Sequence, residues 1–129
     1  KVLFVCSGNK GIFPNIQSQA NPLKKKEVEL EIFPIIDQGL RGYLKNIPKL
    51  KKNILTFKAN IIHSHYSFCG IITSLATKKI PILASLMGSD TYQSELMKST
   101  IRYFANYRLS KTIVKSEDMK IRLGLNNAI

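Results

Sequence analysis

The sequence predicts an α/β fold: a doubly wound, mostly parallel sheet sandwiched by helices. Short apolar runs alternate along the chain with segments of helical periodicity, and this alternation is typical of a parallel sheet that helices cover on both faces. The length of 129 residues fits a single domain. A composition of 44% hydrophobic and 22% charged residues indicates a globular protein rather than a disordered chain or a disulfide scaffold.

The first part of the chain predicts a strand, a helix and a second strand. The apolar run Val2–Cys6 is the first strand, and it is followed by Ser-Gly-Asn. A helix is predicted over Pro14–Lys26, where Pro22 lacks an amide donor and should kink or end it. The segment Val28–Ile32 alternates apolar and polar residues with period two, which is typical of a strand near the edge of a sheet.

The middle of the chain predicts two helical regions around a third strand. Helical spacing runs through residues 40–57, and Pro48 fits best as the first residue of a new helix. A third strand is predicted at Asn60–His63, followed by a helix of small residues from about Cys69 to Lys78.

The last part of the chain repeats the alternation. We expect a fourth strand at Pro81–Leu86, a helix from about Ser94 to Asn106 and a fifth strand at Thr112–Lys115. A final helix should begin near Ser116, which can cap it ahead of two acidic residues, and should end at Gly124.

The charge of the chain predicts an anionic partner. Twenty Lys and Arg residues against eight Asp and Glu give a formal net charge of +12. Nucleic acid, an acidic membrane surface and phosphorylated small molecules are all candidates by charge alone. The sequence argues against nucleic acid, because aromatic residues are few and no DNA-binding or RNA-binding motif occurs.

The sequence predicts a cytoplasmic protein. No apolar run approaches the roughly 20 residues that cross a bilayer, and the chain opens directly on a strand without a signal segment. Peripheral attachment to the inner face of the plasma membrane stays open because of the positive charge. Cys6 and Cys69 are expected to be buried and reduced rather than bridged.

Polar and small residues follow the predicted strands, and they form the shortlist for a binding site. In doubly wound folds, ligands bind in loops beyond the carboxyl ends of the strands. The loops are Ser7–Gly11, His63–Ser67, Met87–Asp90 and Ser116–Glu117.

Each of these loops has a structural interpretation beside the functional one. The loop with Gly8 and Gly11 could bring backbone amides to an anion or simply make a tight turn. His65 could be a general acid or base, a hydrogen-bond donor to a substrate hydroxyl, or a structural residue. For His63 a structural role is expected. Asp90 could accept hydrogen bonds from sugar hydroxyls or cap the next helix through the amide of Gln93. No metal site is predicted, because His63 and His65 are expected on alternate faces of the strand and no pair of thiolates accompanies them.

The opening segment Val2–Asn9 resembles the phosphate loop of low-molecular-weight protein tyrosine phosphatases. In that family the cysteine is the nucleophile and an arginine stands six residues later, whereas this chain has Ile12 there. Isoleucine cannot contact a phosphate or stabilise a thiolate, and no Asp-Pro pair is present to act as the general acid. The sequence therefore argues against a phosphatase.

A second resemblance covers nearly the whole chain, and it is to the amino-terminal domain of family-four glycosyltransferases of the GT-B fold. These enzymes include bacterial ones that build cell-surface polysaccharides. The resemblance rests on the order and spacing of several segments rather than on any single motif. The segments are Lys1–Gly11, the helix with Gln17 and Gln19, Val28–Pro34, Gly39–Leu44, Ile61–Tyr66, Ser85–Asp90 and Thr112–Glu117.

The resemblance implies a Rossmann-like, acceptor-side domain of residues 1–129 in a two-domain enzyme. A nucleotide-sugar donor is expected in a carboxyl-terminal domain that this chain lacks, and no cofactor is expected here. The implied acceptor is a cell-surface glycan or a lipid-linked glycan. His65 and Asp90 are the implied catalytic residues, and acceptor or phosphate-loop contacts are expected from Gly8, Asn9, Lys10, Gly11, Tyr66, Gly88, Ser89 and Glu117.

The chain departs from the family pattern at one position of the implied site. The loop after the fourth strand normally reads His-Gly-x-Asp, whereas here it reads Met87-Gly88-Ser89-Asp90. Methionine cannot donate a polar hydrogen bond or carry a proton, as the histidine of the family can. Either His65 or Asp90 takes over the role of that histidine, or backbone and substrate groups do, or the activity is altered. Without a donor domain we expect the chain alone to be inactive. The alternative function is a basic, non-catalytic module that binds a glycan or lipid surface.

Overall fold

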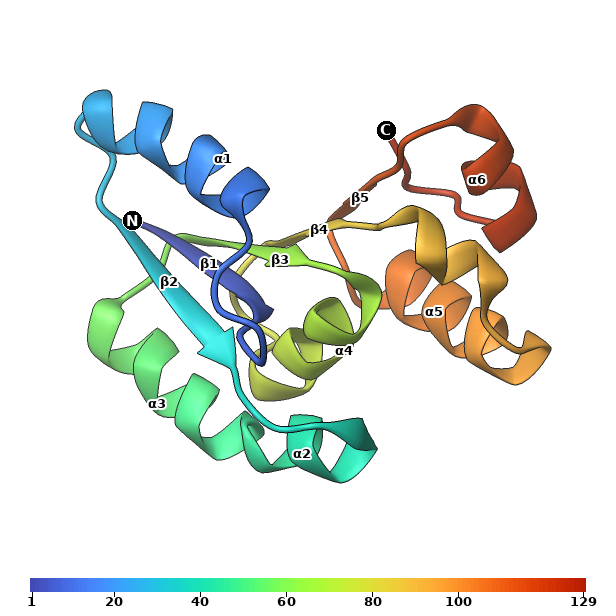
Figure 1. The fold of residues 1–129 in the computed structure, drawn as a ribbon, viewed down its shortest axis with the longest axis horizontal. Helices are drawn as coiled ribbons and strands as arrows, with labels where there is room; N and C mark the ends of the chain where they lie inside the picture. The colour runs from blue at the N-terminus through green and yellow to red at the C-terminus, as the bar shows by residue number, and fades with distance from the viewer.

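A computed structural model describes residues 1–129, and its centre is one five-stranded sheet in which all strands are parallel. The strand order is β2-β1-β3-β4-β5, so the predicted parallel sheet is confirmed (Figure 1). The strands are β1 Val2–Ser7, β2 Leu30–Ile35, β3 Ile61–His65, β4 Ile82–Ser85 and β5 Lys111–Ile113.

Six α-helices and a short 3₁₀-helix connect the strands. They are α1 Pro14–Lys25, α2 Gly39–Lys45, α3 Ile47–Phe57, α4 Ser67–Ala76, the 3₁₀-helix η1 Gly88–Tyr92, α5 Glu95–Tyr107 and α6 Glu117–Leu123. Every predicted element is present, but η1 was not predicted. None of the helices has the length and apolar composition that crossing a bilayer requires.

The end of β3 differs from the prediction. The strand runs to His65, two residues beyond the predicted end, and α4 begins at Ser67 rather than Cys69. The amide of Tyr66 donates to the carbonyl of Ser85, so the ladder to β4 continues past His65. His65 is therefore part of the sheet rather than of a loop.

The edge strand β2 lies two or three residues later than predicted. Its register pairs Pro34 with Cys6 of β1. The neighbouring Ile35 directs its carbonyl to the amide of Gly8, so Pro34 turns its nitrogen, which has no hydrogen, to the free edge. Pro22 was predicted to kink or end the first helix, and an end at Pro22 is wrong, because α1 continues to Lys25. The proline lies in the last turn, on an exposed side.

Helices cover the two faces of the sheet unequally. The larger core lies under α3, α4 and α5, and it includes Leu3, Leu50 and Ile62. A smaller core of Phe4, Cys6 and residues of α1 lies on the other face. The order of the strands reverses between β1 and β3, and in open α/β sheets ligands bind at the carboxyl ends of the strands beside such a reversal.

Candidate functional site

A cavity of about 410 Å³ opens at the carboxyl ends of β1, β3 and β4, where a doubly wound sheet is expected to bind its ligand. Its wall combines hydroxyl groups, an amide and an imidazole with apolar side chains, and none of the lining residues carries a formal charge at neutral pH. The lining residues are Ser7, Phe13, Asn15, Ile16, Tyr43, His65, Tyr66, Met87 and Ser89.

His65 is the buried polar side chain in this wall that lacks partners. Only 2% of the residue is exposed, and neither Nδ1 nor Nε2 has a hydrogen-bond partner. Burial, together with the neighbouring His63, lowers the pKa of His65 to about 4. The ring is therefore neutral at pH 7, so one nitrogen can donate a hydrogen bond and the other can accept one.

Two aromatic rings hold His65 in place. Phe4 lies edge-on at 4.8 Å between ring centroids, and the ring of His63 lies at 4.2 Å. The expectation that the two histidines lie on alternate faces is wrong, because residues two apart in a strand point to the same face. Nε2 of His63 lies 2.8 Å from Oγ of Ser85, so the predicted structural role of His63 fits its contacts. His65 is left as the histidine with free nitrogen atoms.

Tyr66 follows His65 with a strained backbone. Its φ angle is 93°, a region that residues other than glycine rarely adopt, and such strain clusters at functional sites. Burial, and after it the nearby Asp90 carboxylate, raises the pKa of Tyr66 to about 12. Its phenol therefore stays protonated and can donate a hydrogen bond into the cavity.

Asp90 is not among the residues that line the cavity. The residue is 0% exposed. Its Oδ1 accepts a 2.5 Å hydrogen bond from Oγ of Ser67, and its Oδ2 accepts a 2.6 Å hydrogen bond from the amide of Met87. Burial raises the pKa of Asp90, and these hydrogen bonds act against the shift. The predicted cap on Gln93 is wrong: Asp90 reaches back to Met87, at the start of η1, and joins two loops of the site.

The glycine loop, residues 8–11, is held against β2 and the segment that follows it. A side chain at Gly8 would lie 2.5 Å from Cβ of Pro34, so only glycine allows this approach to β2. The side chain of Asn9 accepts a hydrogen bond from the amide of Asp37 and donates one to its carbonyl. Lys10 is exposed, and Gly11 has a φ of 79°. The loop is therefore fixed to the connection between β2 and α2, and none of these residues is among those lining the cavity.

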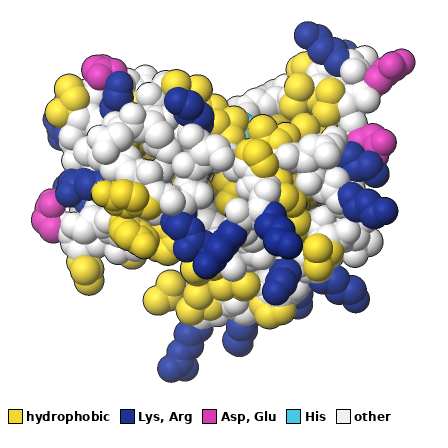
Figure 2. All heavy atoms as spheres, turned by 180° about the vertical axis from the view of Figure 1, so that it is seen from behind, with side chains coloured by type: hydrophobic (Ala, Val, Ile, Leu, Met, Phe, Trp, Pro, Cys, Tyr) yellow, Lys and Arg dark blue, Asp and Glu magenta, His cyan; other side chains and the backbone are white.

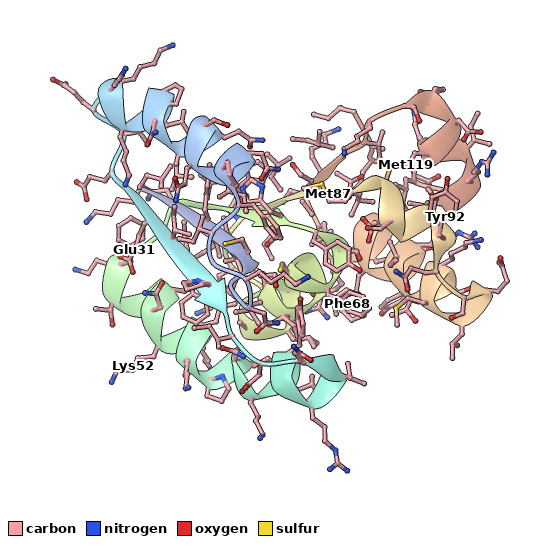
Figure 3. All side chains as sticks on the ribbon, viewed as in Figure 1. Glu31, Lys52, Phe68, Met87, Tyr92 and Met119 are labelled. Atoms are coloured by element: carbon pink, nitrogen blue, oxygen red, sulfur yellow. The ribbon has the colours of Figure 1, made fainter.

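The other predicted site residues separate into two groups. Ser89 is part of the wall, next to Gly88 at the start of η1. Glu117 is exposed in the first turn of α6, where it forms an ion pair with Lys120 at 3.5 Å, and it is not part of the wall. Met87 is part of the wall, and Figure 3 shows it at the end of β4 between the α1 and α6 parts of the molecule.

The sequence analysis missed Phe13, Asn15 and Tyr43 as parts of the wall. Phe13 and Asn15 flank the proline that begins α1, so the start of the helix after the glycine loop was the available signal. Tyr43 comes from α2, which follows β2, and the end of this strand was not among the strand ends from which the site was predicted.

The thiols have no nucleophilic character. Cys6 and Cys69 are both free and buried, as predicted. Burial raises the pKa of Cys6 to about 11, whereas a nucleophilic cysteine needs a lowered value. The structure therefore agrees with the argument against a phosphatase. No three His, Cys, Asp or Glu side chains are grouped so that they could hold a metal ion.

The profile of a family described as "Glycosyl transferase 4-like" matches residues 3–116. No curated protein matches the chain significantly in sequence. A sucrose-phosphate synthase from Thermosynechococcus elongatus has a similar fold, with a TM-score of 0.72, 11% identity, and coverage of 99% of this chain and 83% of that one.

HepE from Anabaena, solved in complex with UDP, is also similar in fold. The TM-score is 0.67 at 14% identity, and the match covers 100% of this chain but only 43% of the HepE chain. At these identities the likeness is one of fold, and this chain spans less than half of HepE.

Proposed function

The chain belongs to the glycosyl transferase 4-like family, and from this premise we propose that it is the acceptor-binding half of a glycosyltransferase. The enzyme would move a sugar from a nucleotide-sugar to a cell-surface glycan or a lipid-linked glycan. In this proposal residues 1–129 bind the acceptor, and a further domain binds the donor. The chain alone does not complete the transfer, because a closed cleft between two domains is needed to orient the reacting groups and exclude water.

The observation that carries the proposal is the buried, unpartnered imidazole of His65 in an uncharged cavity wall. Leaving a buried polar group without a partner costs about 1–3 kcal/mol, so a ligand that supplies the partner gains from it. Sugar hydroxyls both donate and accept, so two of them, one for each ring nitrogen, would satisfy His65. The hydroxyls of Ser7, Tyr66 and Ser89 and the ring of Tyr43 suit a polyhydroxylated ligand of mixed polar and apolar surface.

The low pKa of His65 limits its role. A general base works best when its pKa is near the working pH, and His65, with a pKa of about 4, is a weak base. We therefore assign His65 the task of binding and orienting the acceptor hydroxyl. Asp90 is a positioning residue in this proposal, because it acts through Ser67 and Met87.

The donor site belongs to the other half of the proposed enzyme. HepE was solved with UDP, and the match to this chain covers 43% of HepE. By analogy, the nucleotide-sugar of this enzyme would bind mainly to a domain outside residues 1–129. The contact to donor phosphates that the family resemblance implies for Gly8–Gly11 stays a prediction.

The proposal is tested by nucleotide release from the two-domain protein, with UDP-, GDP-, ADP- and CMP-sugars and extracted glycan and lipid acceptors. We expect one donor to be consumed in the presence of an acceptor. His65→Ala should raise KM for the acceptor at least about tenfold, the effect of losing one or two hydrogen bonds. Residues 1–129 alone should release no nucleotide. Full activity of both His65→Ala and Asp90→Ala would remove these residues from the site, and silence with every donor would contradict the proposed reaction.

One observation favours the second candidate, a non-catalytic basic module on an anionic lipid surface. A groove of about 400 Å³ between α3 and the end of α4 is lined by Lys51, Lys78 and Lys79 beside exposed leucines, and these lysines have no ion-pair partner. Each lysine near an anionic bilayer contributes about 1 kcal/mol. Salt-sensitive binding to vesicles with phosphatidylglycerol, and none to phosphatidylcholine alone, would support peripheral attachment. Equal retention on both would contradict it.

A further inference from the structure

A second, apolar cavity continues the acceptor cavity along α2. It has a volume of about 260 Å³, and it is lined by Gly39, Leu40, Tyr43, Tyr66 and Phe68. Tyr43 and Tyr66 line both cavities, so the two share a wall. The rings of Tyr43 and Tyr66 lie 5.8 Å and 5.4 Å from that of Phe68, and Figure 3 shows Phe68 at the start of α4. One continuous surface therefore leads from His65 to α2.

The outer rim of this second cavity exposes large apolar side chains to solvent. Leu40 is 65% exposed, and Leu44, one helical turn later, is 41% exposed. We call Leu40, Tyr43, Leu44 and Phe68 the apolar shelf. A single exposed leucine is ordinary, but an apolar surface that continues a binding cavity marks an interaction site.

A stripe of positive charge runs beside the shelf. Arg41 and Lys45 are four residues apart on α2, so their side chains lie on one side of the helix, next to the leucine stripe. Both are exposed, and neither forms an ion pair. Like charges at this spacing repel each other, so an anion between them would relieve the repulsion.

The wider surface around α2 and α3 has the same sign. Residues 39–58 contain six Lys and Arg residues and no Asp or Glu; they are Arg41, Lys45, Lys49, Lys51, Lys52 and Lys58. Figure 2 shows Lys and Arg among hydrophobic side chains on the lower edge of the molecule, where α2 and α3 lie in Figure 1, and no acidic side chain there in that view. Asp37, which precedes α2, is the acidic residue nearest in sequence.

We propose that the shelf binds the apolar chain of the acceptor, which is an anionic amphiphile: a sugar joined through phosphate to a hydrocarbon chain. The sugar lies at His65, the phosphate faces Arg41 and Lys45, and the chain lies along Leu40, Leu44 and Phe68. This inference rests on the proposed function, and it chooses the lipid-linked acceptor over a free glycan. The polar cavity at His65, the apolar shelf that adjoins it and the positive charge beside the shelf match the sugar, the hydrocarbon chain and the phosphate of this class of ligand.

The first test measures binding by residues 1–129, with farnesyl phosphate as the probe at concentrations below micelle formation. Farnesol and inorganic phosphate are the separate halves of the probe. We expect farnesyl phosphate to bind at least about tenfold tighter than either half, because apolar burial and charge pairing then act together. Equal binding of inorganic phosphate, or no binding of farnesyl phosphate, would overturn the proposal.

Matched variants locate the binding on the shelf. Leu40→Ser with Leu44→Ser should weaken farnesyl phosphate binding about tenfold. Arg41→Gln with Lys45→Gln should weaken it by a similar factor and reduce its salt dependence. Leu96→Ser changes a leucine that is 80% exposed on α5, and Lys24→Gln with Lys25→Gln changes two exposed lysines in the last turn of α1 that form no ion pair. These controls should bind like the unmodified chain, and a loss in the controls equal to that in the shelf variants would overturn the proposal.

The second test separates this inference from the proposed function. In the two-domain protein, the Leu40→Ser and Leu44→Ser double variant should lower the ratio of transfer onto a lipid-linked acceptor to transfer onto the same glycan without lipid, by about tenfold. An unchanged ratio in an active enzyme would overturn the shelf and leave the proposed function standing. Equal losses with both acceptors leave this ratio unchanged and would overturn the shelf in the same way. No transfer to any acceptor would overturn the function, and this inference with it.

Discussion

The two faces of strand β3 differ in whether their buried polar side chains have hydrogen-bond partners. On the face toward α4, Oγ of Ser64 lies 2.9 Å from Oγ1 of Thr73, which donates to the carbonyl of Cys69 at 2.7 Å. On the opposite face, one residue later, both ring nitrogens of His65 are buried without a partner. The same strand thus satisfies one buried polar side chain completely and leaves its neighbour unsatisfied.

This difference separates structural polar groups from groups available to a ligand. The Ser64 side belongs to the packed core, where every polar atom must find a partner inside the protein. The His65 side borders the cavity, and in the proposed function a ligand that enters the cavity supplies the partner. The unsatisfied ring of His65 lowers the stability of the fold, and so does the strained backbone of its neighbour Tyr66.

The largest expected effect is a loss of folding stability at acidic pH. Burial lowers the pKa of both His63 and His65 to about 4, from an ordinary value of 6.5. Between pH 6.5 and pH 4 the unfolded chain binds protons that the folded chain does not, so stability falls as pH falls through this window. The loss is at most about 3 kcal/mol per histidine at ~1.4 kcal/mol per pKa unit. Urea unfolding from pH 8 to pH 4 measures it.

A double variant, His63→Phe with His65→Phe, is the control for the acid effect. It should flatten the stability curve between pH 6.5 and pH 4, because no buried imidazole remains to take up protons. The raised pKa of Asp90 and the lowered pKa values of Glu29 and Glu95 act equally in both proteins and cancel in the comparison. An identical slope in the double variant would show that the histidines do not cause the loss.

Truncating a side chain on the core face of β3 should lower stability without changing ligand binding. Ile62 is fully buried under the helices of the larger core, so Ile62→Ala should lower the free energy of unfolding by about 3 kcal/mol. Farnesyl phosphate binding, measured where the variant is still folded, should stay unchanged. A loss of binding without a loss of stability would mean that this face, too, belongs to the site.

The strain at Tyr66 predicts a smaller effect with a distinctive sign. Tyr66→Ala and Tyr66→Gly remove the same ring, but only glycine adopts a φ of 93° without strain. Tyr66→Gly should therefore be more stable than Tyr66→Ala by about 1 kcal/mol. Elsewhere in a chain alanine is usually the more stable of the two, so the opposite order would contradict the strain. Thermal unfolding of the two variants side by side decides it.

Most of the fold could be predicted from the sequence, because apolar periodicity and turn residues act locally. The alternation of runs such as Val2–Cys6 with helical segments predicted the parallel sheet and the place of β2 at its edge. The sequence could not predict that α1 continues past Pro22. Whether a proline ends a helix depends on where it lies in the helix and whether it is exposed, and Pro22 is exposed in the last turn. The end of β3 depends on the ladder to β4, which is a contact distant in sequence.

The candidate site could be predicted only in part, for the same reason. Strand ends pointed to His65, Tyr66 and Ser89, which the structure brings together in one wall. They also pointed to Glu117, whose place depends on where α6 packs. The contribution of Tyr43 from α2 and the connection of Asp90 to Ser67 arise from tertiary packing, which no spacing in the sequence encodes.

The central claim is that the free nitrogens of His65 receive an acceptor sugar. Ring ¹⁵N NMR of the two histidines, during titration with methyl glycosides of common hexoses and N-acetylhexosamines, tests it most directly. We predict a saturable shift of the His65 ring nitrogens with at least one glycoside, and a smaller shift of His63, whose Nε2 already contacts Ser85. Saturable shifts elsewhere in the chain with none at His65 would contradict the claim.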